Sequence, residues 1–120
     1  MTNTERRAPD ALAGPVADPD HHHVLFENDE VRVVETRIPA GVRSPVHTHH
    51  RRQVQYFLSG SHFCRRDPSG VVLVDSRAIE GFVLPRVQWS DGTPAHTLEN
   101  TGSDELHVIG IELKDGEPAG

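Results

Sequence analysis

A chain of 120 residues is long enough to form one domain with its own core, and its single cysteine, Cys64, excludes a disulfide within the chain. The formal net charge of −6 argues against a basic nucleic-acid groove, and no apolar run reaches the roughly 20 residues that a membrane helix needs. We therefore expect no nucleic-acid partner and no membrane partner. Since the first residues show no apolar export signal, a cytoplasmic location is the default expectation.

The first residues differ in composition from the rest of the chain. Residues 1–20 are rich in proline and nearly free of large apolar side chains, so we expect a flexible N-terminal arm there. A run of three histidines at residues 21–23 follows, and we assign it no function. The expected domain covers residues 21–115, and residues 116–120 form a short tail.

Strand-like segments then recur along the domain. Residues 24–26 form a short apolar run, and residues 30–38 alternate between the two faces of a strand. Further candidate strands are residues 54–58, 62–66, 71–75, 82–84, 87–89, 96–99 and 106–113. The stretch at 67–70 has the composition of a hairpin turn. Because turns recur about every ten residues and no segment keeps a helical period, we predict an all-β sandwich or barrel.

Histidines are the most informative residues of this sequence. His47 and His49 are one residue apart, so on a strand both imidazoles point to the same face. Such a pair also occurs by chance on surface strands. A third histidine, His96, lies on another expected strand, and inward-facing histidines are costly unless they are paired or bind something. Three converging imidazoles would hold a divalent Fe, Zn, Mn, Ni or Cu ion and leave coordination positions open.

The spacing around these histidines resembles the motifs of the cupin superfamily. The first cupin motif is a glycine, five residues, His-x-His, a glutamate and a second glycine. This chain is similar to it at Gly41, His47, His49 and Gly60. Gln53 stands where the family has glutamate. His96 and Asn100 resemble the end of the second motif, although its lead-in is degraded here.

The resemblance extends from about residue 24 to residue 114 and carries several expectations. It implies a small double-stranded β-helix, or jelly-roll, barrel. It also implies Fe²⁺ as the metal, a dioxygenase-like oxidoreductase and a homodimer. Strand edges at the open ends of a small barrel are covered by pairing, and residues 24–34 are the expected contributor.

Gln53 is a candidate fourth ligand through its side-chain oxygen, or else a hydrogen-bond partner beside the metal. A neutral amide leaves the full +2 charge of the ion uncompensated, which makes the ion a stronger Lewis acid. Such a site favours a small anionic chelating molecule, such as an enolate or a 2-oxo or α-hydroxy acid.

Other polar and aromatic side chains are candidates for the chemistry around the metal. The candidate catalytic residues are His62, Tyr56 and His107, although a surface or packing role is the simpler interpretation of each. The candidate walls of a substrate pocket are Gln55, Phe57, Trp89 and His107. Gln55 and Phe57 share the face of Gln53 on their strand, and His107 shares an apolar face with Ile109, Ile111 and Leu113.

Three functions stay open at this point. The first is a non-haem iron dioxygenase-like enzyme, which the resemblance supports. The second is a redox-neutral metal-dependent lyase, isomerase or cyclase, and the third is a binding protein for a small ligand or metal without turnover. A fold does not decide among them, and the sequence names no substrate.

Overall fold

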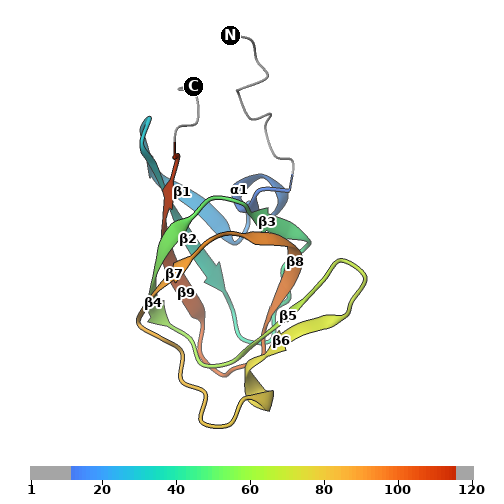
Figure 1. Cartoon of the computed structure of the whole chain (residues 1–120). Helices are drawn as coiled ribbons and strands as arrows, with labels where there is room; N and C mark the ends of the chain where they lie inside the picture. The colour runs from blue at the N-terminus through green and yellow to red at the C-terminus, as the bar shows by residue number, and fades with distance from the viewer. Residues whose placement is uncertain (1–11, 116–120) are drawn as a thin grey trace.

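Two antiparallel sheets face each other and enclose the interior of the protein (Figure 1). The structure is a computed structural model and describes residues 12–115, so the expected tail and the first part of the expected arm lie outside the described residues. The elements are α1 (Gly14–Ala17), β1 (His22–Glu27), β2 (Val31–Ile38), β3 (His47–His49), β4 (Gln53–Ser59), β5 (Phe63–Arg66), β6 (Val72–Asp75), the 3-10 turn η2 (Ser76–Ala78), β7 (Val87–Ser90), β8 (Thr93–Asn100) and β9 (Leu106–Leu113). The prediction of an all-β barrel is confirmed.

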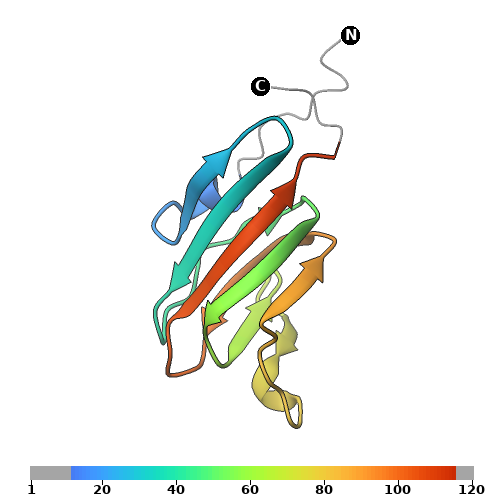
Figure 2. The ribbon, with the colours of Figure 1, turned by 90° about the vertical axis from the view of Figure 1, so that its left-hand side faces the viewer.

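The strand order is β1-β2-β9-β4-β7 in the larger sheet and β3-β8-β5-β6 in the smaller one. Figure 2 shows the larger sheet face-on, with β9 in its centre between β2 and β4. The expected hairpin of residues 62–66 and 71–75 is present as β5 and β6. Its turn is closed by the carboxylate of Asp67, which accepts hydrogen bonds from the backbone N–H groups of Ser69 and Val71.

The hydrophobic core lies where β2 ends and β9 begins. Ile38 is fully buried and pairs in register with Leu106, and both pack with Val108. Partly buried side chains surround this cluster, including Phe57 from β4 and Leu98 from β8. The core therefore joins the two sheets at one place and leaves room between them elsewhere.

Residues 82–84 are not the strand that the sequence predicts. They belong to the loop between η2 and β7, where Phe82 and Leu84 turn inward and Val83 is 82% exposed. Pro85 follows directly and has no N–H to donate to a sheet, so the alternating pattern serves a loop here. In the part of the chain that the structure describes, no helix has the length and apolar character to cross a bilayer.

The segment before β1 packs against the barrel instead of forming a free arm over residues 12–20. Ala13 is buried and forms an isolated bridge with Thr48 of β3. The N–H of Thr48 donates to the carbonyl of Leu12 at 2.6 Å. Asp18 is also buried, with its partners on the following residues. The ordered domain therefore begins earlier than residue 21. The composition of the segment does not reveal these specific partners, which is why the sequence predicts an arm.

Candidate metal centre

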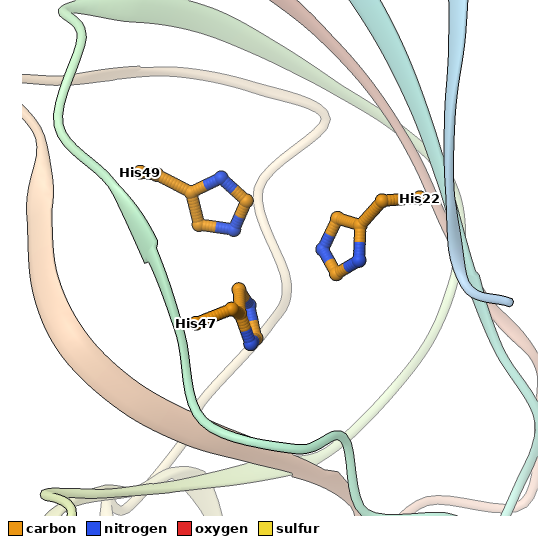
Figure 3. A group of neighbouring side chains, drawn as sticks. All are labelled: His22, His47 and His49. Atoms are coloured by element: carbon orange, nitrogen blue, oxygen red, sulfur yellow. The ribbon is translucent and has the colours of Figure 1, made fainter. Parts of the chain in front are cut away.

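Four histidines from three strands converge inside the barrel. His47 and His49 come from β3, His96 from its neighbour β8, and His22 from β1 in the opposite sheet. Figure 3 shows His22 reaching toward the other two from the far side of the space between the sheets. One ring nitrogen from each of His22, His47 and His49 lies within 4.8 Å of the others.

His96 belongs to the same cluster. It is the register partner of His47, and their ring centroids are 4.4 Å apart. The centroid of His96 is 5.7 Å from that of His49. The site therefore contains the three histidines that the sequence indicates and one more.

Hydrogen bonds to backbone carbonyls fix the protonation of three of these rings. The Nδ1 atoms and carbonyl oxygens are paired as His22 with Asp18 at 3.1 Å, His47 with Pro45 at 2.9 Å, and His96 with Pro94 at 2.7 Å. A carbonyl oxygen only accepts, so each neutral ring must carry its proton on Nδ1. The lone pair then lies on Nε2, the atom that would bind a metal.

Asp18 supports the additional histidine. One of its carboxylate oxygens lies 3.3 Å from Nδ1 of His22, and the other accepts from Nδ1 of His21 at 2.7 Å. Nε2 of His22 is buried and has no hydrogen-bond partner within residues 12–115. A carbonyl that accepts from Nδ1, a carboxylate close behind the ring and an unpartnered nitrogen in front of it are the pattern of a metal-bound histidine.

All four imidazoles are neutral at pH 7. Burial, and after it the neighbouring His47, lowers the pKa of His22 to about 4. Burial likewise lowers the pKa of His96 to about 4. The pKa values of His47 and, more strongly, His49 are also lowered, chiefly by burial. Neutral rings keep their lone pairs available, so the donor set fits a divalent ion.

Two glycines permit this close packing. A Cβ at Gly14 would lie 2.8 Å from a ring carbon of His22 and 3.1 Å from a ring carbon of His49, so α1 closes directly over the site. Gly92 has a φ of +116°, and a Cβ there would lie 2.9 Å from the carbonyl of His50. The loop between β7 and β8 can therefore lie against the backbone that follows the His47–His49 pair.

A cavity of about 140 Å³ opens beside the imidazoles. Its apolar wall includes Phe57, Phe63, Phe82, Leu84 and Leu98. Its polar wall includes Gln53, Gln55, Gln88, Arg65 and Glu112. Gln88 donates from Nε2 to Oε1 of Gln55 at 2.8 Å, which holds the two amides together across β7 and β4. A cavity of this size accommodates a molecule of about the size of benzene.

Gln53 lines the same cavity as the imidazoles. It is buried, and its Nε2 atom has no hydrogen-bond partner within the described residues. Its Oε1 atom lies against Gly110 of β9, where any Cβ would collide with it. Gln53 is thus placed beside the histidine cluster, and its ligation of a metal stays a prediction.

The expected pocket residues separate into two groups. Gln55 and Phe57 lie in the cavity wall. Trp89 and His107 do not line the cavity. Trp89 is 48% exposed and donates from its indole N–H to Asp91 at 2.7 Å. Its side chain points to the outer face of the sheet, because successive residues on a strand point to opposite faces and the preceding residue, Gln88, faces inward.

His107 lies on the outer face of β9, where its Nε2 atom pairs with a carboxylate oxygen of Glu35 at 2.9 Å. The sequence placed it inward because its face is apolar. The face that points into the barrel is the other one, which carries Gly110 and Glu112. An apolar outer face and a partly polar inner face invert the usual pattern, and this inversion explains the difference.

The other two candidate catalytic residues also lie away from the cavity lining. The hydroxyl of Tyr56 accepts from Arg86 at 3.3 Å on the outer face of β4. His62 lies next to Phe82, and its Nδ1 atom is 2.8 Å from the hydroxyl of Ser76. Neither residue lines the cavity beside the histidine cluster. Tyr56 stands between the inward-facing Gln55 and Phe57 on β4 and so points outward, and His62 lies just before β5 begins.

Sequence reasoning missed His22. The signal was present in Asp18, which stands four residues before His22 and lies within reach of it across the turn after α1. That pairing is visible only when the segment before residue 21 is known to be ordered, since its proline-rich composition indicates an arm.

Comparisons with known proteins agree with the architecture. No protein-family model matches the sequence, and a search of curated proteins gave no match either. The structure is similar to a cupin domain from Bordetella pertussis Tohama I, with a TM-score of 0.60 and 23% identity over 78% of this chain and 91% of that chain. It is also similar to an uncharacterized protein with a double-stranded β-helix domain from Klebsiella pneumoniae, with a TM-score of 0.54 and 14% identity over 98% of this chain and 86% of that chain.

An RmlC-like cupin protein from Methanocaldococcus jannaschii gives a TM-score of 0.53 and 11% identity, over 77% of each chain. At such identities the likeness concerns the fold. The strand order, the two facing sheets and these similarities lead to one conclusion: the chain has the cupin fold, a double-stranded β-helix.

Proposed function

We propose that this protein is a metal-dependent enzyme that acts on a small anionic chelating molecule, with a dioxygenase-like activity that uses non-haem iron. The observation that supports it is the convergence of His22, His47, His49 and His96, all neutral, beside a cavity large enough for one small molecule. Imidazole suits Fe, Zn, Cu and Ni, and a donor set of neutral rings leaves the charge of the ion uncompensated. An anionic ligand would complete such a site.

The residues of the cavity would have three separate roles: holding the ion, excluding water and orienting the substrate. The four imidazoles would hold the ion, and bound Fe²⁺ would supply Lewis acidity and one-electron chemistry toward O₂. Phe63 and Leu98 would keep water away from the reacting molecule. The paired amides of Gln55 and Gln88 would orient its polar groups.

The test is O₂ consumption by Fe²⁺-loaded protein in an oxygen electrode, with small 2-oxo acids, α-hydroxy acids and 1,3-diketones as substrates. We expect O₂ uptake in step with substrate loss, and no uptake by a His49→Ala variant. Substrate loss at the same rate without O₂ would replace this proposal with a redox-neutral lyase, isomerase or cyclase. Binding without any substrate loss would indicate a protein that only binds ligand or metal.

Metal should stabilise this fold without being required for it. The core cluster of Ile38, Leu106 and Val108 contains none of the four histidines, so we expect the apo-protein to keep its packing. Binding stabilises by RT ln(1 + [L]/Kd), about 2.7 kcal/mol at a hundredfold excess over Kd. Chelation should therefore lower the melting temperature and leave the β-sheet circular dichroism unchanged. Loss of that spectrum at room temperature on adding chelator would contradict this expectation.

We also propose a homodimer, because the larger sheet exposes apolar side chains along its edge strand β1 and on its outer face. Val24, Leu25 and Phe26 of the edge strand β1 are 44%, 54% and 55% exposed. Trp89 and Ile111 are exposed on the same sheet. Such an apolar surface on an edge strand favours pairing with a second copy.

Sedimentation should show twice the 13.3 kDa mass of one chain. Phe26→Asp should shift the protein toward monomer, because it places a charge in the proposed interface. Val83→Asp is the matched control, since Val83 is exposed on the loop before β7. A wild-type protein that sediments only as monomer at tens of micromolar, or equal behaviour of the two variants, would rule the interface out.

A further inference from the structure

Arg65 is the one cation whose side chain stands in the wall of the cavity beside the histidines without a hydrogen bond or ion pair in residues 12–115. It lies on β5, where alternation turns Phe63 and Arg65 inward. The next residue, Arg66, turns away and forms an ion pair with Glu99 at 2.7 Å. Two adjacent arginines thus have opposite environments.

The Nε atom of Arg65 is buried and has no partner. The guanidinium carbon lies 5.8 Å from the centroid of the Phe63 ring. Burial lowers the pKa of Arg65, yet an arginine stays charged in a protein. A half-buried cation without a counter-charge carries a desolvation cost, and an anion that binds beside it offsets that cost.

The charge of Arg65 acts on the histidine cluster. After burial, which is the main cause, Arg65 is among the groups that lower the pKa values of His47, His49 and His96. Its guanidinium therefore faces the same space as the imidazoles. A divalent ion on those imidazoles would add a second positive charge to that space, and an anion between the two would relieve the repulsion.

Glu112 does not supply that anion. It is the carboxylate in the cavity wall, and its Oε1 atom already accepts from Arg32 at 2.9 Å and from Arg51 at 3.0 Å. Beyond the metal site, the cavity thus has an unmatched positive charge at Arg65 and a matched negative charge at Glu112.

We propose that Arg65 binds the carboxylate of the substrate, and that the substrate is a small carboxylic acid with an apolar body. The fork of the guanidinium matches a carboxylate with two parallel hydrogen bonds. Phe63, Phe82 and Leu98 would receive the body, whose size is limited to about one ring by the 140 Å³ cavity. This inference rests on the proposed function, since it names the substrate class of the same cavity.

The experiment measures binding of benzoate and of benzamide, its neutral counterpart, to the full chain loaded with Zn²⁺, which is redox-silent and allows no oxidation. Calorimetry should show that wild type binds benzoate at least tenfold more tightly than benzamide. Arg65→Met should lose most of that preference, and Arg65→Lys should fall between the two. Arg66→Met is the matched control and should bind benzoate as wild type does. A melting temperature of the Arg65→Met protein at or above that of wild type would show that the lost preference for benzoate does not result from unfolding.

Equal affinity of wild type for benzoate and benzamide, no benzoate binding by wild type, or unchanged benzoate binding by both Arg65 variants would each overturn the assignment. These results are independent of turnover. Arg65-dependent benzoate binding without O₂ uptake on any acid would end the dioxygenase proposal and leave this inference standing. O₂ uptake on an acid at a rate that the Arg65→Met substitution leaves unchanged would support the dioxygenase proposal and end the assignment of Arg65.

Discussion

Replacing His49 by alanine should lower the affinity of the protein for a divalent metal by at least roughly 100-fold, because even the loss of a partner behind a metal ligand costs 10–100-fold. His49 lies among the other imidazoles, with its ring centroid 4.9 Å from that of His47 and 5.3 Å from that of His22. Its removal takes away a lone pair and leaves a void. A titration with Zn²⁺ against a chromophoric chelator measures the change.

His22→Ala tests the ligand that the structure adds, and we expect a loss of at least about tenfold. The matched control is His23→Ala, since His23 is the next residue on β1 and is exposed. Wild-type affinity in the His49→Ala protein would exclude the metal site. Equal affinities of the His22→Ala and His23→Ala proteins would leave a site of three histidines.

Asn100→Asp should cost about 3 kcal/mol or more of unfolding free energy, a large share of the 5–15 kcal/mol by which a domain is usually stable. Asn100 is fully buried. Its Nδ2 atom donates to the carbonyls of Ile38 and Asp104, both at 2.8 Å, and its Oδ1 atom accepts from the N–H of Gly102 at 3.0 Å. Aspartate has the same shape but no donor, so it would place a carboxylate against two carbonyl oxygens.

Asn28→Asp is the control for that substitution. The side chain of Asn28 acts only as an acceptor, from the backbone N–H groups of Glu30 and Val31, and aspartate can take over both bonds. Urea unfolding of the two variants should therefore separate a donor-dependent asparagine from an acceptor-dependent one. Similar midpoints for both proteins would mean that the hydrogen bonds of Asn100 contribute little.

Much of the fold was accessible from the sequence, because its signals are local. The alternation in residues 30–38 and 106–113 and the turn at Asp67 are set by neighbours along the chain, and they correspond to β2, β9 and the hairpin of β5 and β6. Likewise, a spacing of two placed His47 and His49 on one face of a strand.

The remainder depends on contacts between distant segments. Alternation along β9 defines two faces but does not say which one points inward, and that choice decides the position of His107. His22 joins the site because the hairpin of β1 and β2 brings it across the barrel, which no local pattern records. Arg65 is a candidate because its guanidinium lacks a partner in the cavity wall. A sequence carries no direct information on which charges will lack partners in the fold.

The origin of His22 has a consequence for how such sites diverge. The segment from Leu12 to Asp18 lies at the margin of the fold, where a bridge joins Ala13 to Thr48 of β3, and in the described part of the chain β1 pairs with β2 alone. An imidazole delivered from this margin can be gained or lost over evolutionary time without disturbing the pairing of the strands that carry His47, His49 and His96. If the four imidazoles hold an ion, losing His22 would therefore change the number of nitrogen ligands, and with it the redox preference of the ion, while the barrel stays as it is.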